Sequence, residues 1–306
     1  MKIPIHIRYA TATILFVLCF GLSCAQRRRD IEATERRNLI DALGRKVAVK
    51  ANPQRIISLA PNVTEILFAL GLGERVVGVT SYCDYPEAAK TKEKVGDTLN
   101  PDLERIIALK PDLVVITTAS QLEKLTSKLD ELGIPVYITN PRTVREVVSS
   151  ISDLGEVTGA KHQAAEISAQ MEQRINKVEK RVSVLPKLRV FYVLQTGPLI
   201  TAGRKTFIND LIDLAGGRSI SGEETADYPQ FSRETVVARA PAVIVIPASH
   251  GSEFVREADL RRDFATTPAI RFNRIVRVNP DWVDRPGPRI VDGLEQLAKG
   301  LHPESP

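Results

Sequence analysis

The chain has 306 residues, which suits one or two domains, and its 43% hydrophobic and 26% charged residues are ordinary for a globular protein. The net charge of +5 and the pI near 9.1 would suit a protein that binds nucleic acid. However, the basic residues are dispersed, and no RNP, helix-turn-helix or zinc-finger pattern is present. The sequence therefore argues against nucleic-acid binding.

The first 25 residues have the composition of a secretion signal. A weakly basic start is followed by a mostly apolar stretch at residues 11–22 and then by small residues. The apolar stretch is too short for a comfortable membrane span. Two processing routes fit the junction: acylation of Cys24, as in a lipoprotein, or cleavage after Ala25. Both routes predict a periplasmic or otherwise extracytoplasmic protein. Only the first route would attach it to the membrane, through the lipid on Cys24.

Residues 26–50 connect this signal to the folded body. Residues 26–38 are polar and charged, which predicts a tether. Residues 39–50 alternate loosely between apolar and polar, which predicts a β-hairpin with its turn at Leu43 and Gly44.

Residues 51–142 predict a first α/β lobe. Strands are expected at residues 55–59, 76–79, 113–116 and 136–138, and helices at residues 63–70, 104–110 and 122–132. Strands that alternate with short helices in this way are typical of parallel βαβ units.

Residues 143–185 carry almost no strand signal and separate the two lobes. Helices are expected at residues 144–158 and 161–184, and the second would be about 35 Å long. Its apolar residues form one stripe, so it should pack along its length. The segment therefore predicts a rigid helical backbone and not a flexible linker.

Residues 186–306 predict a second α/β lobe. Strands are expected at residues 190–194, 199–201, 243–246 and 275–278, and helices at residues 207–215, 234–240 and 289–301. The glycines at 216–217 are expected to end a helix, and residues 281–288 to form a polar, proline-rich loop.

A repeat relates the two lobes. The segment ERIIALKPDLVVI at residues 104–116 recurs 130 residues later as ETVVARAPAVIVI at residues 234–246. Each copy predicts a short helix that opens on a glutamate and ends before a proline, followed by a strand buried on both faces. The separation is too long for a solenoid repeat. The sequence thus predicts two similar lobes, each with one surface glutamate, Glu104 or Glu234.

The motifs of catalysis are missing. The sequence contains neither a nucleophile elbow nor a P-loop, and its glycine pairs follow helices instead of opening them. Cys83 is the one cysteine in the body, and the four histidines are scattered, so neither a disulfide framework nor a metal site is expected. The sequence therefore predicts a binding protein without a cofactor; an extracellular enzyme is the alternative from a different class.

Five segments resemble the periplasmic substrate-binding proteins for vitamin B12 and iron siderophores, and most of all the vitamin B12-binding component of ABC importers. They are RIISLAPNVTEILFALG (55–71), VGVTSYCDYPEAA (77–89), LERIIALKPDLVVI (103–116), YPQFSRETVVARAP (228–241) and DWVDRPGPRIVDGLEQLA (281–298). The resemblance implies a class III solute-binding protein. Such a protein has two Rossmann-like lobes with parallel central sheets, joined by a long rigid helical backbone, with a ligand in the cleft and little hinge motion.

The resemblance also implies roles for individual residues. Glu104 and Glu234 match the glutamates that engage arginines of the permease, a pairing that is bidentate and geometrically selective. The alternative is that each is an acid favoured at a helix start by the dipole. Ligand contacts in the cleft are implied for Pro61, Asn62, Tyr82, Tyr228, Trp282 and Arg285. The aromatic rings would cover a macrocycle, with ordinary loop packing of the tyrosines as the alternative.

Two departures from the vitamin B12 binders concern the ligand. Thr98 and Thr117 stand where those proteins carry tryptophans, and Arg204 and Arg285 would suit the anionic groups of a siderophore. We therefore expect a monomeric substrate-binding protein of an ABC importer that passes its ligand to a permease and its ATPase. A cobalamin-type corrinoid is the first choice of ligand, and a ferric siderophore or haem is the alternative.

Overall fold

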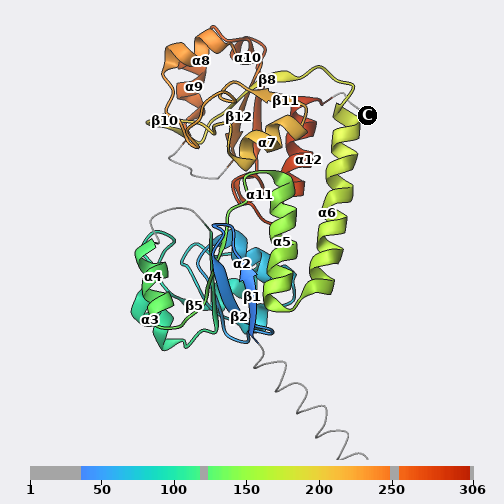
Figure 1. Ribbon diagram of the computed structural model, residues 1–306. Coiled ribbons are helices and arrows are strands. Elements are labelled where there is room, and N and C mark those ends of the chain that lie inside the picture. The colour runs from blue at the N-terminus through green and yellow to red at the C-terminus, as the bar shows by residue number, and fades with distance from the viewer. Residues whose placement is uncertain (1–35, 118–122, 249–254, 304–306) are drawn as a thin grey trace, which may run out of the picture.

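The computed structural model describes residues 36–117, 123–248 and 255–303. They form two α/β lobes that are stacked along a pair of long helices (Figure 1). The secretion signal and Cys24 lie outside the described residues. Within the described ranges, no helix combines the length and the apolar character that a membrane span needs.

The first lobe is built on a five-stranded parallel sheet in the order β5-β4-β3-β6-β7. Its strands are β3 (Ile56–Ser58), β4 (Val76–Val79), β5 (Glu93–Lys94), β6 (Leu113–Thr117) and β7 (Val136–Thr139). Its helices are α2 (Pro61–Ala69), α3 (Leu103–Ala108) and α4 (Glu123–Glu131), with single 3₁₀ turns at Gly73–Arg75 and Glu87–Thr91. The strands β3 and β6 are buried along nearly their whole length, which explains why their sequences do not alternate between apolar and polar residues.

The expected hairpin is present and packs against this lobe. Strands β1 (Arg36–Ile40) and β2 (Lys46–Lys50) pair antiparallel, so the hairpin begins three residues earlier than expected. The Ala42 N–H donates to the Ile138 carbonyl at 3.0 Å, and Val47 and Val49 are buried. Residues 36–38 therefore belong to the folded body and not to a tether.

Two helices run between the lobes, as expected. Helix α5 (Val144–Thr158) is capped by the Thr143 side chain and ends at Gly159, whose φ of 79° favours glycine. Helix α6 (Lys161–Val182) follows and buries an apolar stripe that includes Met171 and Ile175. It lies beside α5 and contacts α12 (Ile290–Leu301) of the second lobe (Figure 1).

The second lobe is built on a four-stranded parallel sheet in the order β11-β8-β12-β13. Its strands are β8 (Leu188–Tyr192), β11 (Gly217–Ser219), β12 (Val243–Pro247) and β13 (Ile275–Val278), and β9 (Gln195–Thr196) pairs separately with β10 (Leu199–Ile200). Its helices are α7 (Phe207–Leu214), α8 (Arg233–Arg239), α9 (Glu257–Asp263), α10 (Pro268–Arg271), α11 (Pro280–Val283) and α12 (Ile290–Leu301).

Two local expectations are wrong. Gly216 ends α7 with a φ of 82°, but Gly217 already begins β11, a short edge strand aligned by its parallel pairing with β8. Residues 281–288 were expected to be a loop, yet their start belongs to α11. There Pro280 occupies the first turn and the Asn279 side chain accepts the Asp281 N–H.

The repeat extends to the backbone conformation. Asp102 and Ser232, each two residues before the repeat glutamate, cap α3 and α8 by accepting an N–H three residues on. Lys110 and Ala240, each six residues after the glutamate, both adopt a left-handed conformation, with φ of 45° and 42°. The two lobes therefore present α3 and α8 in the same local geometry.

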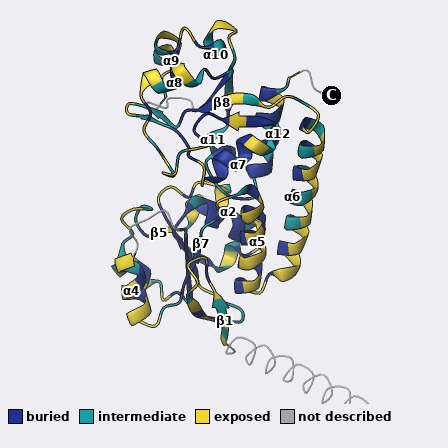
Figure 2. Cartoon of the chain, turned by 45° about the horizontal axis from the view of Figure 1, so that its top comes forward, coloured by how far each residue is buried: buried dark blue, intermediate teal, exposed yellow. Residues whose placement is uncertain are grey.

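One hydrophobic core spans both lobes and the helices between them. Figure 2 shows the strands and the inward faces of the helices in dark blue, with exposed residues on the outer face of α6. Fully buried members come from α2, α5, α6, α7 and α12; examples are Val63, Leu154, Ile175, Leu211 and Leu294. Because packed cores are dense and deform little, this continuity holds the lobes in a fixed relation.

Candidate ligand-binding cleft

A cavity of about 330 Å³ lies between the two lobes. The first lobe lines it with residues 60–62, Thr98, Thr117 and residues 140–142, and the second lobe with residues 206–207, 227–228 and 284–286. The first-lobe residues lie at the carboxyl end of strand β6 or shortly after the carboxyl ends of strands β3, β5 and β7. Parallel strands end at one edge of a sheet, which is where open α/β folds bind ligands.

Four of the six residues expected to contact a ligand line this cavity: Pro61, Asn62, Tyr228 and Arg285. Thr98 and Thr117, which stand in place of the tryptophans, line it too. The other two expected residues do not line it. Tyr82 is exposed in the loop after β4, and Trp282 is half-buried in α11.

Arg204 is separate from the cleft. It borders an open basic groove of about 810 Å³ on the second lobe, beside Arg218 and Arg239.

Arg285 is surrounded by carboxylates of the protein. Its guanidinium lies 2.7 Å from Asp84 Oδ1, 3.1 Å from Asp281 Oδ1 and 3.6 Å from Glu65 Oε1. The hydrogen bond from Arg285 is the main reason that the pKa of Asp84 lies below its ordinary value. The Arg285 side chain therefore borders the cavity while its charge is engaged elsewhere.

Arg289 extends this network between the lobes. Its guanidinium makes two hydrogen bonds of 2.6 and 2.9 Å to the carboxylate of Glu65, which is only 3% exposed. It also lies 3.7 Å from the ring centroid of Tyr85, a cation–π contact. A bidentate pair of this kind fixes both partners in geometry.

A second set of contacts joins the lobes through residues 142–144. Arg142, from the first lobe, pairs with Asp227 of the second. The Val144 N–H at the start of α5 donates to Asp210 Oδ2 on α7 at 2.7 Å. Both arginines that line the cavity are thus paired across the cleft.

Asp284 is a cavity residue that sequence reasoning missed. The buried Tyr192 hydroxyl donates a 2.7 Å hydrogen bond to Asp284 Oδ1. Burial, the largest cause, raises the pKa of Asp284 to about 6, although the Tyr192 hydrogen bond acts in the opposite direction. Asp284 lies within a polar loop motif, and nothing in the sequence around it indicates that its carboxylate is buried and bonded to Tyr192.

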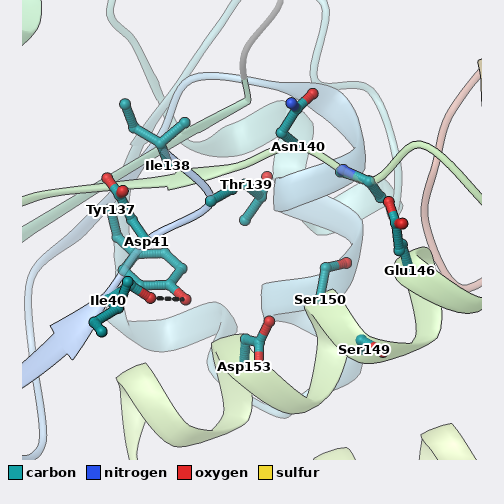
Figure 3. A pocket seen from close by; sticks show the side chains of 12 residues that line it. Ile40, Asp41, Tyr137, Ile138, Thr139, Asn140, Glu146, Ser149, Ser150 and Asp153 are labelled. Carbon is teal, nitrogen blue, oxygen red and sulfur yellow. Dashed lines mark hydrogen bonds between the residues drawn. The ribbon is translucent and has the colours of Figure 1, made fainter. Parts of the chain in front are cut away.

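A cavity of about 230 Å³ lies within the first lobe, between the hairpin end, β7 and α5 (Figure 3). It carries the acidic side chains of Asp41, Glu146 and Asp153, and the Tyr137 hydroxyl donates to the Ile40 carbonyl at 3.4 Å. In the part of the chain that the structure describes, no three His, Cys, Asp or Glu residues are grouped to hold a metal ion. The cleft is the better candidate site because both lobes contribute to it.

The repeat glutamates lie on the surface, in the first turns of α3 and α8. Hydrogen bonds from its own N–H and from Ser232 lower the pKa of Glu234. One turn after each glutamate lies an exposed apolar side chain, Ile107 (39% exposed) or Val237 (38%). Each lobe therefore shows the same pairing of an acid with an apolar residue.

Comparison with known proteins connects this architecture to a family. The family described as periplasmic binding protein matches residues 56–281. The chain is 31% identical over 246 residues to the vitamin B12-binding protein of Vibrio parahaemolyticus, a match that covers 80% of this chain and 88% of the relative. It is 30% identical to an uncharacterised ABC transporter substrate-binding lipoprotein of Bacillus subtilis, over 97% of each chain.

Solved structures show the same fold. The periplasmic vitamin B12-binding protein of Vibrio cholerae is similar with a TM-score of 0.73 and 30% identity, over 81% of this chain and 96% of that one. The periplasmic haem-binding protein of Roseiflexus sp. RS-1 is similar with a TM-score of 0.74 and 27% identity, over 82% and 98%. The predicted class III α/β fold is confirmed. With the family matched over most of its length, the chain belongs to the periplasmic binding proteins, a family of solute-binding proteins.

Proposed function

We propose that the protein is an extracytoplasmic substrate-binding protein of an ABC importer that captures a cobalamin-type corrinoid in the cleft between its lobes. The observation that carries this proposal is the cleft cavity, in which Pro61, Asn62, Tyr228 and Arg285 meet. These are residues of the segments shared with vitamin B12 binders. The names of the relatives from two Vibrio species support the same ligand class.

The size of the cleft is compatible with part of a large ligand. About 330 Å³ lies at the lower end of the range for small-molecule sites. A macrocycle larger than the cavity would extend onto the exposed rings of Tyr82 and Tyr228. Aromatic rings offer a large apolar area at low cost in side-chain entropy. Trp282 would contribute at the rim of the site.

Haem or a ferric siderophore is the second candidate. The likeness to the Roseiflexus haem-binding protein supports it. So do Thr98 and Thr117, because these small side chains line the cavity where the vitamin B12 binders have large aromatic surfaces.

Delivery of the ligand to the permease would depend on the two glutamates of the repeat. Glu104 and Glu234 would pair with arginines on the permease, one from each lobe. Their exposure and their equivalent local geometry support this role. The protein would act as a monomer, without chemistry on its ligand.

The remaining parts of the proposal concern processing and organisation. Cleavage before Cys24 would leave that cysteine as the first residue, where it would carry a lipid anchor; cleavage after Ala25 would instead remove all of residues 1–25 as the signal. The name of the Bacillus subtilis relative, a lipoprotein, supports the lipid-anchor route. Residues 26–50, 51–142, 143–185 and 186–306 would be the tether with hairpin, the first lobe, the helical backbone and the second lobe.

Calorimetric titration of residues 26–306 with cyanocobalamin and aquocobalamin tests the ligand. One-to-one binding with a submicromolar Kd, roughly −8 kcal/mol or tighter, is expected. If the titration releases no heat and the protein retains no cobalamin colour after gel filtration, haem or a siderophore becomes the favoured ligand.

A further inference from the structure

The open groove on the second lobe is a site distinct from the cleft. It has a volume of about 810 Å³ and shares no lining residue with the cleft cavity. Its lining includes β11, the edge strand of the four-stranded sheet, together with residues of α7 and of the end of α8. Sites for small molecules occupy about 300–1,000 Å³, so this groove is large enough to hold a ligand of its own.

The lining of the groove is basic. Five of the lining residues are cationic, and two, Asp213 and Glu223, are acidic. Glu224, which does not line the groove, pairs with Arg239 at 2.7 Å, and counting it still leaves two positive charges in excess. The groove therefore attracts anions. The five cationic residues are Lys187, Arg189, Arg204, Arg218 and Arg239.

Two of these arginines lie side by side without a carboxylate partner. Arg189 on β8 and Arg218 on β11 are direct partners in the parallel register, and both residues are exposed. Neighbouring strands are about 4.8 Å apart. Within the described part of the chain, neither guanidinium makes an ion pair or a hydrogen bond. Like charges in this arrangement destabilise a sheet. An anion between them would remove the repulsion, and phosphate matches the fork of a guanidinium.

Arg239 is fixed in position in the same groove. Its Nη1 donates to the Ile220 carbonyl at 2.6 Å, and its Nη2 donates to Glu224 at 2.7 Å. Its guanidinium also lies 4.9 Å from the ring centroid of Phe231. A guanidinium has more N–H donors than these two acceptors occupy. Arg239 thus offers further donors to a ligand from an orientation that is already set, which reduces the entropy lost on binding.

Asn209 adds a polar group that has no partner in the protein. It lines the groove and is only 8% exposed, and its buried Oδ1 accepts no hydrogen bond from the described residues. An unpaired buried acceptor costs free energy, which a donor on a ligand would recover. Gly222 also lines the groove and leaves space here, since a Cβ at that position would lie 3.3 Å from this oxygen. A hydroxyl group can donate to Oδ1 directly or through one water.

We propose that this groove is a second ligand site, which binds a phosphate ester of a polyhydroxyl compound. Arg189 and Arg218 hold the phosphate, Arg239 supplies further N–H donors, and Asn209 accepts a hydrogen bond from a hydroxyl of the ligand. The proposal does not depend on which ligand the cleft binds. A soluble polyol phosphate and the headgroup of phosphatidylglycerol share this chemistry, and the experiment distinguishes these two sources.

The experiment uses residues 26–306, which include every described residue. The groove variant is Arg189→Gln, Arg218→Gln, which removes the paired charges and keeps polar side chains. The control is Lys124→Gln, Arg271→Gln, which makes the same change in total charge at exposed positions on α4 and α10 that do not line the groove. Glycerol 3-phosphate is titrated by calorimetry at constant ionic strength, so that screening stays the same. Flotation assays compare vesicles of phosphatidylglycerol and of phosphatidylcholine.

The wild type and the control should bind glycerol 3-phosphate with a Kd below about 1 mM, and the groove variant at least about tenfold more weakly. Methyl phosphate, which lacks the hydroxyl groups, should bind the wild type at least about threefold more weakly than glycerol 3-phosphate. Binding to phosphatidylglycerol vesicles that only the groove variant loses would identify a lipid headgroup as the source. Binding of glycerol 3-phosphate alone would identify a soluble ligand.

Three results would overturn the proposal. They are the failure of the wild type to bind either glycerol 3-phosphate or phosphatidylglycerol vesicles, affinities of the groove variant and the control that agree within about twofold, and equal affinities for methyl phosphate and glycerol 3-phosphate. Thermal unfolding without phosphate checks the fold of each variant. Because the groove variant loses the repulsion between Arg189 and Arg218, it should unfold at a temperature no lower than the control.

Discussion

The Tyr192 hydroxyl donates a 2.7 Å hydrogen bond to Asp284 Oδ1 where strand β8 ends at the cleft. The two residues are 92 positions apart in the chain. The tyrosine is fully buried, and burial raises the pKa of the aspartate to about 6 from an ordinary value of 3.8. The protein thus maintains a carboxylate in the cleft at neutral pH at a cost in stability.

This cost predicts a pH-dependent effect of Asp284→Asn. Because the folded-state pKa is raised, the native state binds the proton more tightly than the unfolded state, so stability falls as pH rises from 3.8 to about 6. Above that window the ionised group costs up to about 3 kcal/mol. Urea unfolding should find the variant more stable than the wild type at pH 7.5 by up to this amount, and nearly equal to it at pH 4. The same difference in stability at pH 7.5 and at pH 4 would contradict the raised pKa of Asp284.

The pair between Glu65 and Arg289 predicts a large loss of stability on Glu65→Gln. Arg289 would keep its half-buried guanidinium but lose its bidentate carboxylate. Breaking a buried pair in this way should lower the free energy of unfolding by about 3 kcal/mol. Asp84→Asn is the control, since the Asp84 side chain is 52% exposed and its loss should cost less than about 1 kcal/mol. Equal losses in urea unfolding would mean that Glu65 contributes no more than a surface acid.

The left-handed residues of the repeat predict a matched pair of stabilising changes. Lys110 and Ala240 adopt φ of 45° and 42°, which costs a residue other than glycine roughly 1 kcal/mol or more. Lys110→Gly and Ala240→Gly should each stabilise the fold by about 0.5 kcal/mol, after the larger entropy loss of glycine is deducted. Lys124→Gly, within helix α4, should instead destabilise by about 1 kcal/mol. Thermal unfolding of the three variants would show whether the two repeat positions respond alike.

The proposed docking role predicts that transport and ligand binding can be separated. The double variant Glu104→Ala, Glu234→Ala changes two surface residues outside the cleft. It should retain ligand affinity but lose at least about tenfold in uptake of labelled cyanocobalamin by host cells, because charge-assisted pairs to the permease would be lost. The double variant Glu123→Ala, Glu131→Ala removes the same charge from α4 and should transport normally. Normal uptake of cyanocobalamin by cells with the first variant would contradict the proposed docking role of the two glutamates.

The sequence alone predicted most of the framework. Local conformational preference and burial depend on residues that are neighbours in the chain. They are visible in the apolar runs of strands β6 and β12, in the glycine after α5 and in the repeat at residues 104–116 and 234–246. They were enough to predict two parallel α/β lobes joined by long helices. The family segments then placed Pro61 and Tyr228 among the residues that now line the cleft.

Only the tertiary structure decided how the charges are partnered. The sequence shows Arg285 as a cation that would suit an anionic ligand, whereas the fold surrounds it with Asp84, Asp281 and Glu65. Likewise, Tyr192 and Asp284 meet only because β8 and α11 converge at the cleft. Burial and electrostatic partners depend on which distant segments the fold brings together, and the local pattern of residues does not record that.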